Sequence, residues 1–234
     1  MHNLIDKIIR LVENLELVQC FLSRSRPLSL SKMNSEPHRY FILNKPYNMV
    51  SQFVSTHEVR LLGDLGFNFP EGTHAVGRLD NLSEGLLILT TNKKVTRLLF
   101  QGETPHKRTY LVLVNYTVTD ESLQQLRSGV SFQIKGGDDY VSEPCEVDIV
   151  KDPEISFQSP YIMTEHIPYT WLRISLTEGK FHQVRKMVSA VRHRCKRLIR
   201  VSIEDLLLGD LQPGEVKEFA EEEFFRKLKI DYPA

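Results

Sequence analysis

The chain has 234 residues and a mass of 27.1 kDa, and its 30 basic and 30 acidic residues leave no formal net charge. A hydrophobic content of 41% is typical of a soluble globular protein with a sizeable core. No apolar stretch approaches the roughly 18 residues of a membrane span, and the first residues lack the pattern of a secretory signal. Three well-separated cysteines, Cys20, Cys145 and Cys195, indicate reduced thiols in a cytoplasmic protein rather than a disulfide framework or a zinc site.

The first 38 residues differ from those that follow. Apolar residues recur at helical spacing over 4–15, which predicts a short amphipathic helix. A polar segment rich in Ser, Arg and Pro follows over 23–35 and is typical of a linker. Met33, at the end of this segment, is an alternative to Met1 as the start of translation. We therefore expect an N-terminal extension over 1–38, a main domain over 39–219 and an acidic C-terminal tail over 220–234.

From residue 39 onward, short strand-like runs alternate with helical ones. Apolar or alternating residues predict strands over 40–43, 74–79, 85–89, 107–115, 141–150 and 171–176. Helical spacing predicts helices over 93–100 with a cap at Thr91 or Asn92, over 119–126 with a cap at Thr119, and over 181–191. Because these elements mix without a regular βαβ repeat, we predict an α+β fold with a mixed, largely antiparallel central sheet flanked by helices.

Basic residues gather between Gly179 and Ile203, a segment that contains no Asp or Glu. A basic block in a neutral protein is typical of a surface that binds a phosphate backbone. A solvated helix face is the alternative interpretation of the same residues. The block consists of Lys180, Arg185, Lys186, Arg192, Arg194, Lys196, Arg197 and Arg200.

The run from Gly77 to Thr90 is the most informative stretch of the chain. It places one carboxylate, Asp80, in a tight polar turn between two apolar segments. Reactive side chains often lie on loops held by rigid neighbours. Asp and Asn also favour turns because they hydrogen-bond the backbone, so spacing alone favours an ordinary Asx turn.

The wording of this run, Gly-Arg-Leu-Asp-x-x-Ser-Glu-Gly-Leu-Leu-Ile-Leu-Thr, closely resembles the catalytic signature of the pseudouridine synthases. The resemblance is to the RsuA/RluB/RluE/RluF branch, which modifies ribosomal RNA. In that family the Asp of the Arg-Leu-Asp triplet is the essential catalytic residue, and the matching position here is Asp80. The segment from Lys45 to Phe53, with its Lys-Pro-Tyr and Ser-Gln-Phe triplets, is closer to the RluE subgroup than to the others.

Further segments resemble the other motifs of this family, in the family's order. Residues 43–46 resemble the first motif, and Arg108-Thr109-Tyr110 resembles the Lys-x-Tyr segment that supplies an active-site tyrosine, with Arg where Lys is usual. Residues 178–187 resemble the third motif, 197–200 the Arg-Leu-Ile-Arg segment and 208–215 the closing stretch. The resemblance runs from about residue 40 to 219. It implies the pseudouridine synthase fold, without the S4 RNA-binding domain that many relatives carry.

The resemblance also implies an activity, the isomerisation of a uridine to pseudouridine within RNA. Asp80 would act on the sugar, on the base or on a ribose proton, and these three routes stay open. Arg185 would form an ion pair that keeps Asp80 charged and oriented, and Tyr110 would stack on the uracil and pass a proton. RNA contacts are expected from Lys45, Arg78, Arg108, Lys180, Lys186, Arg192, Arg194, Lys196 and Leu198, the last of which would pack beneath the target base.

The reaction adds and removes no atoms, so we expect neither a metal nor a small-molecule cofactor. The expected partner is ribosomal RNA, with the 23S RNA of the large subunit ahead of 16S or transfer RNA. We expect a cytoplasmic monomer that does not associate with a membrane.

Two other functions would use some of the same residues. A non-catalytic RNA-binding or ribosome-assembly factor on the same fold would use the basic block but would not need Asp80. A hydrolase with Asp80 and Glu84 as paired carboxylates would require a separation of roughly 5 to 9 Å across a sugar, which a single turn does not provide. We therefore expect Glu84 to be structural, paired with the turn backbone or a nearby Arg. His74, His106 and His182 lack the spacing of metal ligands.

Overall fold

The structure is a computed structural model that describes residues 37–102, 104–158, 160 and 163–232. The chain divides into residues 1–37 and a unit over 38–234. The helix expected over 4–15 and the linker expected over 23–35 lie outside the described residues.

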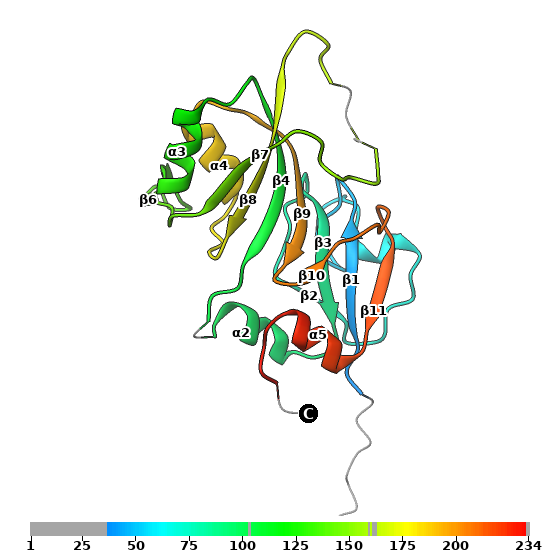
Figure 1. Cartoon of the computed structure of the whole chain (residues 1–234). Helices are drawn as coiled ribbons and strands as arrows, with labels where there is room; N and C mark the ends of the chain where they lie inside the picture. The colour runs from blue at the N-terminus through cyan, green and yellow to red at the C-terminus, as the bar shows by residue number, and fades with distance from the viewer. Residues whose placement is uncertain (1–36, 103, 159, 161–162, 233–234) are drawn as a thin grey trace, which may run out of the picture. The chain divides into compact units, whose positions relative to one another are not determined.

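A nine-stranded sheet forms the centre of the described part of the second unit (Figure 1). Its strands run in the order β11-β1-β3-β9-β4-β8-β7, with β10 paired to β9 and β2 paired to β3. Of these pairings, only β3 with β9 is parallel, over two residue pairs, so the predicted mixed and largely antiparallel sheet is confirmed. The strands are β1 (Tyr40–Lys45), β2 (His74–Val76), β3 (Glu84–Thr90), β4 (Arg108–Asn115), β7 (Glu146–Val150), β8 (Tyr169–Leu176), β9 (Cys195–Ile203), β10 (Leu206–Leu207) and β11 (Val216–Phe219).

A separate antiparallel pair is formed by β5 (Ser131–Gln133) and β6 (Asp139–Val141). The strand predicted over 141–150 is therefore wrong as one element. Strand β6 ends at Val141, the first residue of the predicted strand, and β7 begins only at Glu146. Pro144 lies between them, and a proline has no N–H to give to a strand ladder.

Helices flank the sheet as predicted. They are α2 (Lys94–Phe100), α3 (Asp120–Ser128), α4 (Gln183–Ala190) and α5 (Glu221–Lys227), with a short 3-10 helix over Leu62–Leu65. The predicted cap of α3 is confirmed, because the Thr119 hydroxyl accepts a hydrogen bond of 3.2 Å from the Ser122 N–H. The cap of α2 is Lys93 rather than Thr91 or Asn92, although the Asn92 side chain accepts a hydrogen bond from the Lys94 N–H.

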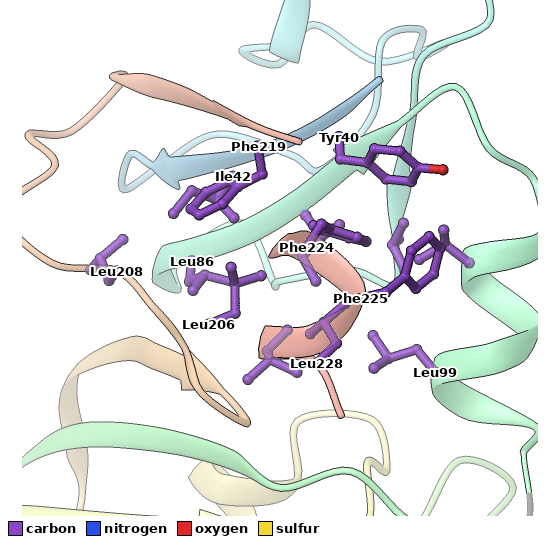
Figure 2. Close-up of a cluster of buried hydrophobic side chains, with 14 of the residues drawn as sticks. Tyr40, Ile42, Leu86, Leu99, Leu206, Leu208, Phe219, Phe224, Phe225 and Leu228 are labelled. Atoms are coloured by element: carbon purple, nitrogen blue, oxygen red, sulfur yellow. The ribbon is translucent and has the colours of Figure 1, made fainter. Parts of the chain in front are cut away.

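One face of the sheet packs against α2 and α5. Tyr40 and Ile42 of β1 both point into this core, because alternate residues of a strand lie on the same face of the sheet. Figure 2 shows Phe224 and Phe225 of α5 packed in the same cluster. The segment expected as an acidic tail thus contains a helix with two buried phenylalanines, while its glutamates lie in the first turn, where the helix dipole favours negative charge.

The opposite face carries two separate apolar clusters. One, built on β1 and β3, includes Phe41, Leu43 and Leu79. The other, built on β4, β8 and the helices α3 and α4, includes Leu198. Tyr110 of β4 packs against both clusters, so it lies where the two halves of this face meet.

Candidate active site

A cleft of about 860 Å³ opens where the two clusters meet. Its walls come from the turn over 77–83, from β4 and β9, and from the segment over 176–184 that leads into α4. Six of the residues proposed from sequence line this one cleft. They are Arg78, Asp80, Arg108, Tyr110, Lys180 and Leu198.

The turn that carries Asp80 is held by backbone and neighbouring side chains. The Ser83 N–H donates to the Asp80 carbonyl oxygen over 3.0 Å, which closes the turn. The Ser51 hydroxyl donates to the Leu79 carbonyl oxygen and accepts from the Leu79 N–H. Within the described residues, none of these bonds uses the Asp80 carboxylate, so the turn is not an Asx turn and the acidic group stays available to the cleft.

The Asp80 carboxylate contacts a histidine. Oδ1 of Asp80 lies 3.5 Å from Nε2 of His182, and the aspartate side chain is 31% exposed. His182 precedes α4 with a left-handed backbone (φ 56°), a conformation that costs a non-glycine residue about 1 kcal/mol or more. Its ring stacks on Phe181 with 3.9 Å between centroids, and Phe181 itself is exposed. Backbone strain beside a cleft residue is typical of a functional position.

The ion pair expected between Arg185 and Asp80 is not formed. Instead the Arg185 guanidinium donates to the Leu82 carbonyl oxygen (2.8 Å), the Ser83 hydroxyl (3.4 Å) and the Cys195 sulfur (3.5 Å). The reason is the start of α4, predicted at residue 181 but found at Gln183. His182, the left-handed residue before the helix, points its imidazole toward Asp80. Arg185 instead contacts the same turn through Leu82 and Ser83.

Lys45 was expected to contact RNA, but the structure leaves none of its side chain exposed. Its side chain is fully buried at the end of β1, where its ammonium donates to the carbonyl oxygens of Pro46 (2.8 Å), Met49 (2.6 Å) and Asn81 (3.3 Å). Burial lowers the pKa of Lys45 to about 7, against the opposing attraction of Glu84 and Asp80. Through these bonds the residue ties the first motif to the turn that carries Asp80.

The other basic residues that were expected to contact RNA or Asp80 do not line the cleft. Arg185, Arg192 and Arg194 line a second cavity of about 490 Å³. Lys186 donates to the Gln133 carbonyl oxygen over 2.7 Å, and Lys196 is half-buried on β9. The basic block is thus neither one helix face nor one surface, because it covers α4, a loop and β9.

The structural role expected for Glu84 is confirmed. Its two carboxylate oxygens accept two hydrogen bonds of 2.9 Å from Arg197, and both side chains are buried. Next to it, Gly85 has φ 98°, and a Cβ there would lie 2.3 Å from the Arg200 carbonyl oxygen. This glycine lets β3 lie directly against β9 in the parallel pair.

Three more residues line the cleft, Phe181, His182 and Arg200; the sequence placed Arg200 in the basic block, but it assigned none of the three to the active site. Phe181 and His182 lie inside the third motif, but their side-chain directions depend on the left-handed turn before α4. Arg200 follows Leu198 by two residues on β9, so a strand assignment for 195–203 would have placed both on one face.

No group of three or more His, Cys, Asp or Glu side chains in the described part of the chain could hold a metal ion. No helix in those residues is long and apolar enough to cross a membrane.

Comparisons with known proteins agree with the motifs in this cleft. Residues 39–190 match the family model described as RNA pseudouridylate synthase. The chain is 35% identical over 193 residues to "Ribosomal large subunit pseudouridine synthase E" of Vibrio vulnificus, with 82% of this chain and 80% of that protein covered. It is 35% identical over 174 residues to the protein of the same name in Xanthomonas axonopodis pv. citri, covering 74% and 89%.

More distant relatives agree as well. "Ribosomal small subunit pseudouridine synthase A" of Escherichia coli K12 is 29% identical, over 79% of this chain and 72% of that protein. Among solved structures, one described as "Crystal structure of pseudouridylate synthase" superposes with a TM-score of 0.65 at 24% identity, covering 82% and 74%. At that identity the superposition supports the fold alone.

Proposed function

The chain belongs to the RNA pseudouridylate synthase family and is a pseudouridine synthase, an isomerase; from this premise we propose that it modifies one specific uridine of large-subunit ribosomal RNA, with Asp80 as the essential catalytic residue. Two relatives that are 35% identical over most of their length are named for the large subunit, and this supports the choice of substrate. We further infer that the catalytic domain covers residues 39–219 and that the enzyme works as a cytoplasmic monomer.

One observation supports the role of Asp80 above the others. Its carboxylate is half-buried in a cleft that also contains Tyr110 and Leu198, and the hydrogen bonds of its own turn do not use it. A carboxylate in such a position is free to act as a nucleophile or as a general base.

The reaction breaks the bond between N1 of the uracil and C1′ of the ribose, and it forms a bond between C5 and C1′. The C5 proton is lost and N1 gains one, so the atoms balance. The detached sugar must be kept from water, which a cleft rather than an open surface provides. Asp80 is the carboxylate that attacks C1′ or the base, or that removes a ribose proton.

The neighbours of Asp80 suggest how the base is held. Leu198, almost fully buried at the cleft wall, offers an apolar surface beneath the uracil, and Tyr110 offers an aromatic face. A uracil inside folded RNA must first be everted at a cost of a few kcal/mol. The exposed Arg78, two residues before Asp80, is positioned to fill the vacated space or hold neighbouring phosphates.

Mapping pseudouridines in ribosomal RNA from a strain that lacks this gene tests the proposal. We expect one uridine of the large-subunit RNA to lose its modification, and we expect the wild-type gene to restore it. Asp80→Asn should not restore it, although the purified variant should bind the RNA as tightly as wild type. Asp148→Asn, which changes a carboxylate on β7 outside the cleft, is the matched control and should restore the modification. If every uridine keeps its modification in the deletion strain, the proposed substrate is wrong.

A further inference from the structure

Two arginines line the active-site cleft without a carboxylate partner. Arg108, at the start of β4, and Arg200, on β9, are 7% and 3% exposed. Neither forms an ion pair with any described residue. The two strands are neighbours in the sheet, where Tyr110 pairs with Arg200.

Each guanidinium has a buried nitrogen with no hydrogen-bond partner. Nε of Arg200 donates to the Leu86 carbonyl oxygen over 2.8 Å, but its Nη2 has no acceptor among the described residues. Arg108 lies 4.9 Å above the ring of Phe100, and its Nε has no acceptor there either. Two independent donors in one cleft are thus left unsatisfied.

Among the acidic groups near these arginines, Asp80 contacts His182 and forms an ion pair with neither arginine, and two others are already engaged. Glu178, which also lines the cleft, accepts hydrogen bonds from Tyr140, from Gln183 and from the Glu143 N–H. Glu204 attracts Arg108 electrostatically, but its carboxylate lies within ion-pair distance of His106 and Lys229. Lys45 lies nearby and, in its charged form, is repelled by Arg200 rather than neutralising it.

A buried charge without a counterion is unfavourable, because several kcal/mol of hydration are lost for each ion. The same strand shows the ordinary solution, since Arg197 is equally buried but has both oxygens of Glu84. Arg108 and Arg200 keep their charge because a guanidinium cannot release its proton near neutral pH. Burial and mutual repulsion only lower the pKa of Arg108 from its usual high value.

We propose that Arg108 and Arg200 together bind one phosphate group of the RNA, at or next to the everted uridine. This inference rests on the proposed function and deepens it. A phosphate supplies the missing negative charge and accepts several N–H donors at once, whereas a uracil carbonyl would satisfy one donor and leave the charge uncompensated.

The position of Arg200 selects which phosphate this is. Arg200 follows Leu198 by two residues on one strand, so both side chains face the same side of the sheet. Leu198 lies where the target base is expected, and Arg200 also pairs with Tyr110 across the strands. The bound phosphate therefore belongs to the target nucleotide or to its immediate neighbour.

A cycle of protein and RNA variants tests this site. The probe is a synthetic RNA that contains the mapped uridine, made with the native backbone or with one uncharged methylphosphonate at each of the four phosphates around it. Arg200→Gln is the main protein variant, because the glutamine amide nitrogen occupies the chain position of Nε and keeps the bond to Leu86. Arg108→Gln is the second variant, and all affinities are measured in the Asp80→Asn background so that the RNA is not converted.

We expect Arg200→Gln to weaken binding of the native RNA by about tenfold or more, the usual effect of losing a charge-assisted contact. In the RNA whose methylphosphonate replaces the bound phosphate, that contact is already lost, so Arg200→Gln should weaken binding by less than about twofold. Arg108→Gln should show this small effect at the same methylphosphonate position. The matched control Arg194→Gln, an exposed arginine of the second cavity, should weaken every one of these RNAs by the same factor.

The outcomes separate the two proposals. If wild-type enzyme forms pseudouridine but the arginine variants and the methylphosphonates act independently at all four positions, the phosphate site is wrong and the proposed function stands. If wild-type enzyme forms no pseudouridine in the mapped RNA, the proposed function fails first. Thermal unfolding without RNA is a separate check, because removal of an unpaired buried charge should leave the melting temperature of Arg200→Gln no lower than that of wild type.

Discussion

Nε2 of His182 lies 3.5 Å from Oδ1 of Asp80, and the histidine holds this position from a left-handed backbone at the start of α4. A histidine therefore occupies the place where an arginine partner was expected. When protonated, this imidazole stabilises the ionised carboxylate and fixes its direction.

We expect His182→Gly to lower kcat by roughly tenfold with little change in KM, because the contact to Asp80, the proposed catalytic group, is lost. Glycine is the suitable replacement, since it accepts φ 56° without strain and adds no new group. Added imidazole should recover part of kcat. Lys229→Gly, at another residue with φ 56° outside the cleft, controls for the backbone change and should keep full activity. If His182→Gly keeps the kcat of wild type, the contact between His182 and Asp80 has no role in the reaction.

Gly85→Ala should strongly destabilise the fold. Its Cβ would lie 2.3 Å from the Arg200 carbonyl oxygen, and φ 98° is unfavourable for alanine, so we expect a loss of roughly 3 kcal/mol or more. Gly72→Ala isolates the backbone term, because Gly72 also has a positive φ (78°) but has open space around it. That variant should lose only about 1 kcal/mol. Urea unfolding measures both, and equal losses would mean that the contact between β3 and β9 is not tight.

Arg197→Met should cost about 3 to 5 kcal/mol of unfolding free energy, because it leaves the Glu84 carboxylate buried without a partner. Changing Glu84 to Leu in the same protein should recover most of this loss, since an apolar pair replaces the ion pair. The double-variant cycle is measured by chemical denaturation. If the double variant is no more stable than Arg197→Met, the buried charge is not the cause.

Lys45 predicts a specific dependence of stability on pH. In the unfolded chain a lysine keeps a pKa near 10.4, whereas burial lowers the folded value to about 7. Between these values the unfolded state holds a proton that the folded state has lost, so stability contributed by this group rises with pH, by up to about 1.4 kcal/mol per pH unit. Below pH 7 both states are protonated and the contribution is constant.

The measurement is urea unfolding of wild type and Lys45→Met at pH 7, 8 and 9. Lys45→Met will be less stable overall, because three carbonyl oxygens lose their donor. The informative quantity is the slope, which should be smaller in the variant by roughly the amount above. Parallel slopes would show that Lys45 titrates normally.

The fold class was predictable because β1, β3, β4 and β8 carry clear apolar patterns. The helix α3 was predictable to its cap, since the Thr119 hydroxyl and the first turn obey a local rule. Strand β11 and helix α5 were not predicted. Their stability comes from pairing with β1 and from packing with Phe224 and Phe225, which are contacts between distant parts of the chain.

The residues of the cleft were only partly predictable from the sequence motifs. Motifs indicated Asp80 and Tyr110 as candidates, and both line one cleft. They could not indicate that Lys45 is buried, because a lysine after a strand has the same sequence pattern whether it faces solvent or the protein interior. They also could not reveal the left-handed turn at His182, which decides whether a histidine or Arg185 contacts the carboxylate.

The position of Tyr110 has one more consequence. Its ring closes a seam between two halves of the sheet, whereas its hydroxyl has no part in that closure. Architecture and the proposed chemistry at this residue thus reside in different atoms, and Tyr110→Phe separates them: it keeps the ring between the two clusters and removes the hydroxyl that we propose acts on the uracil.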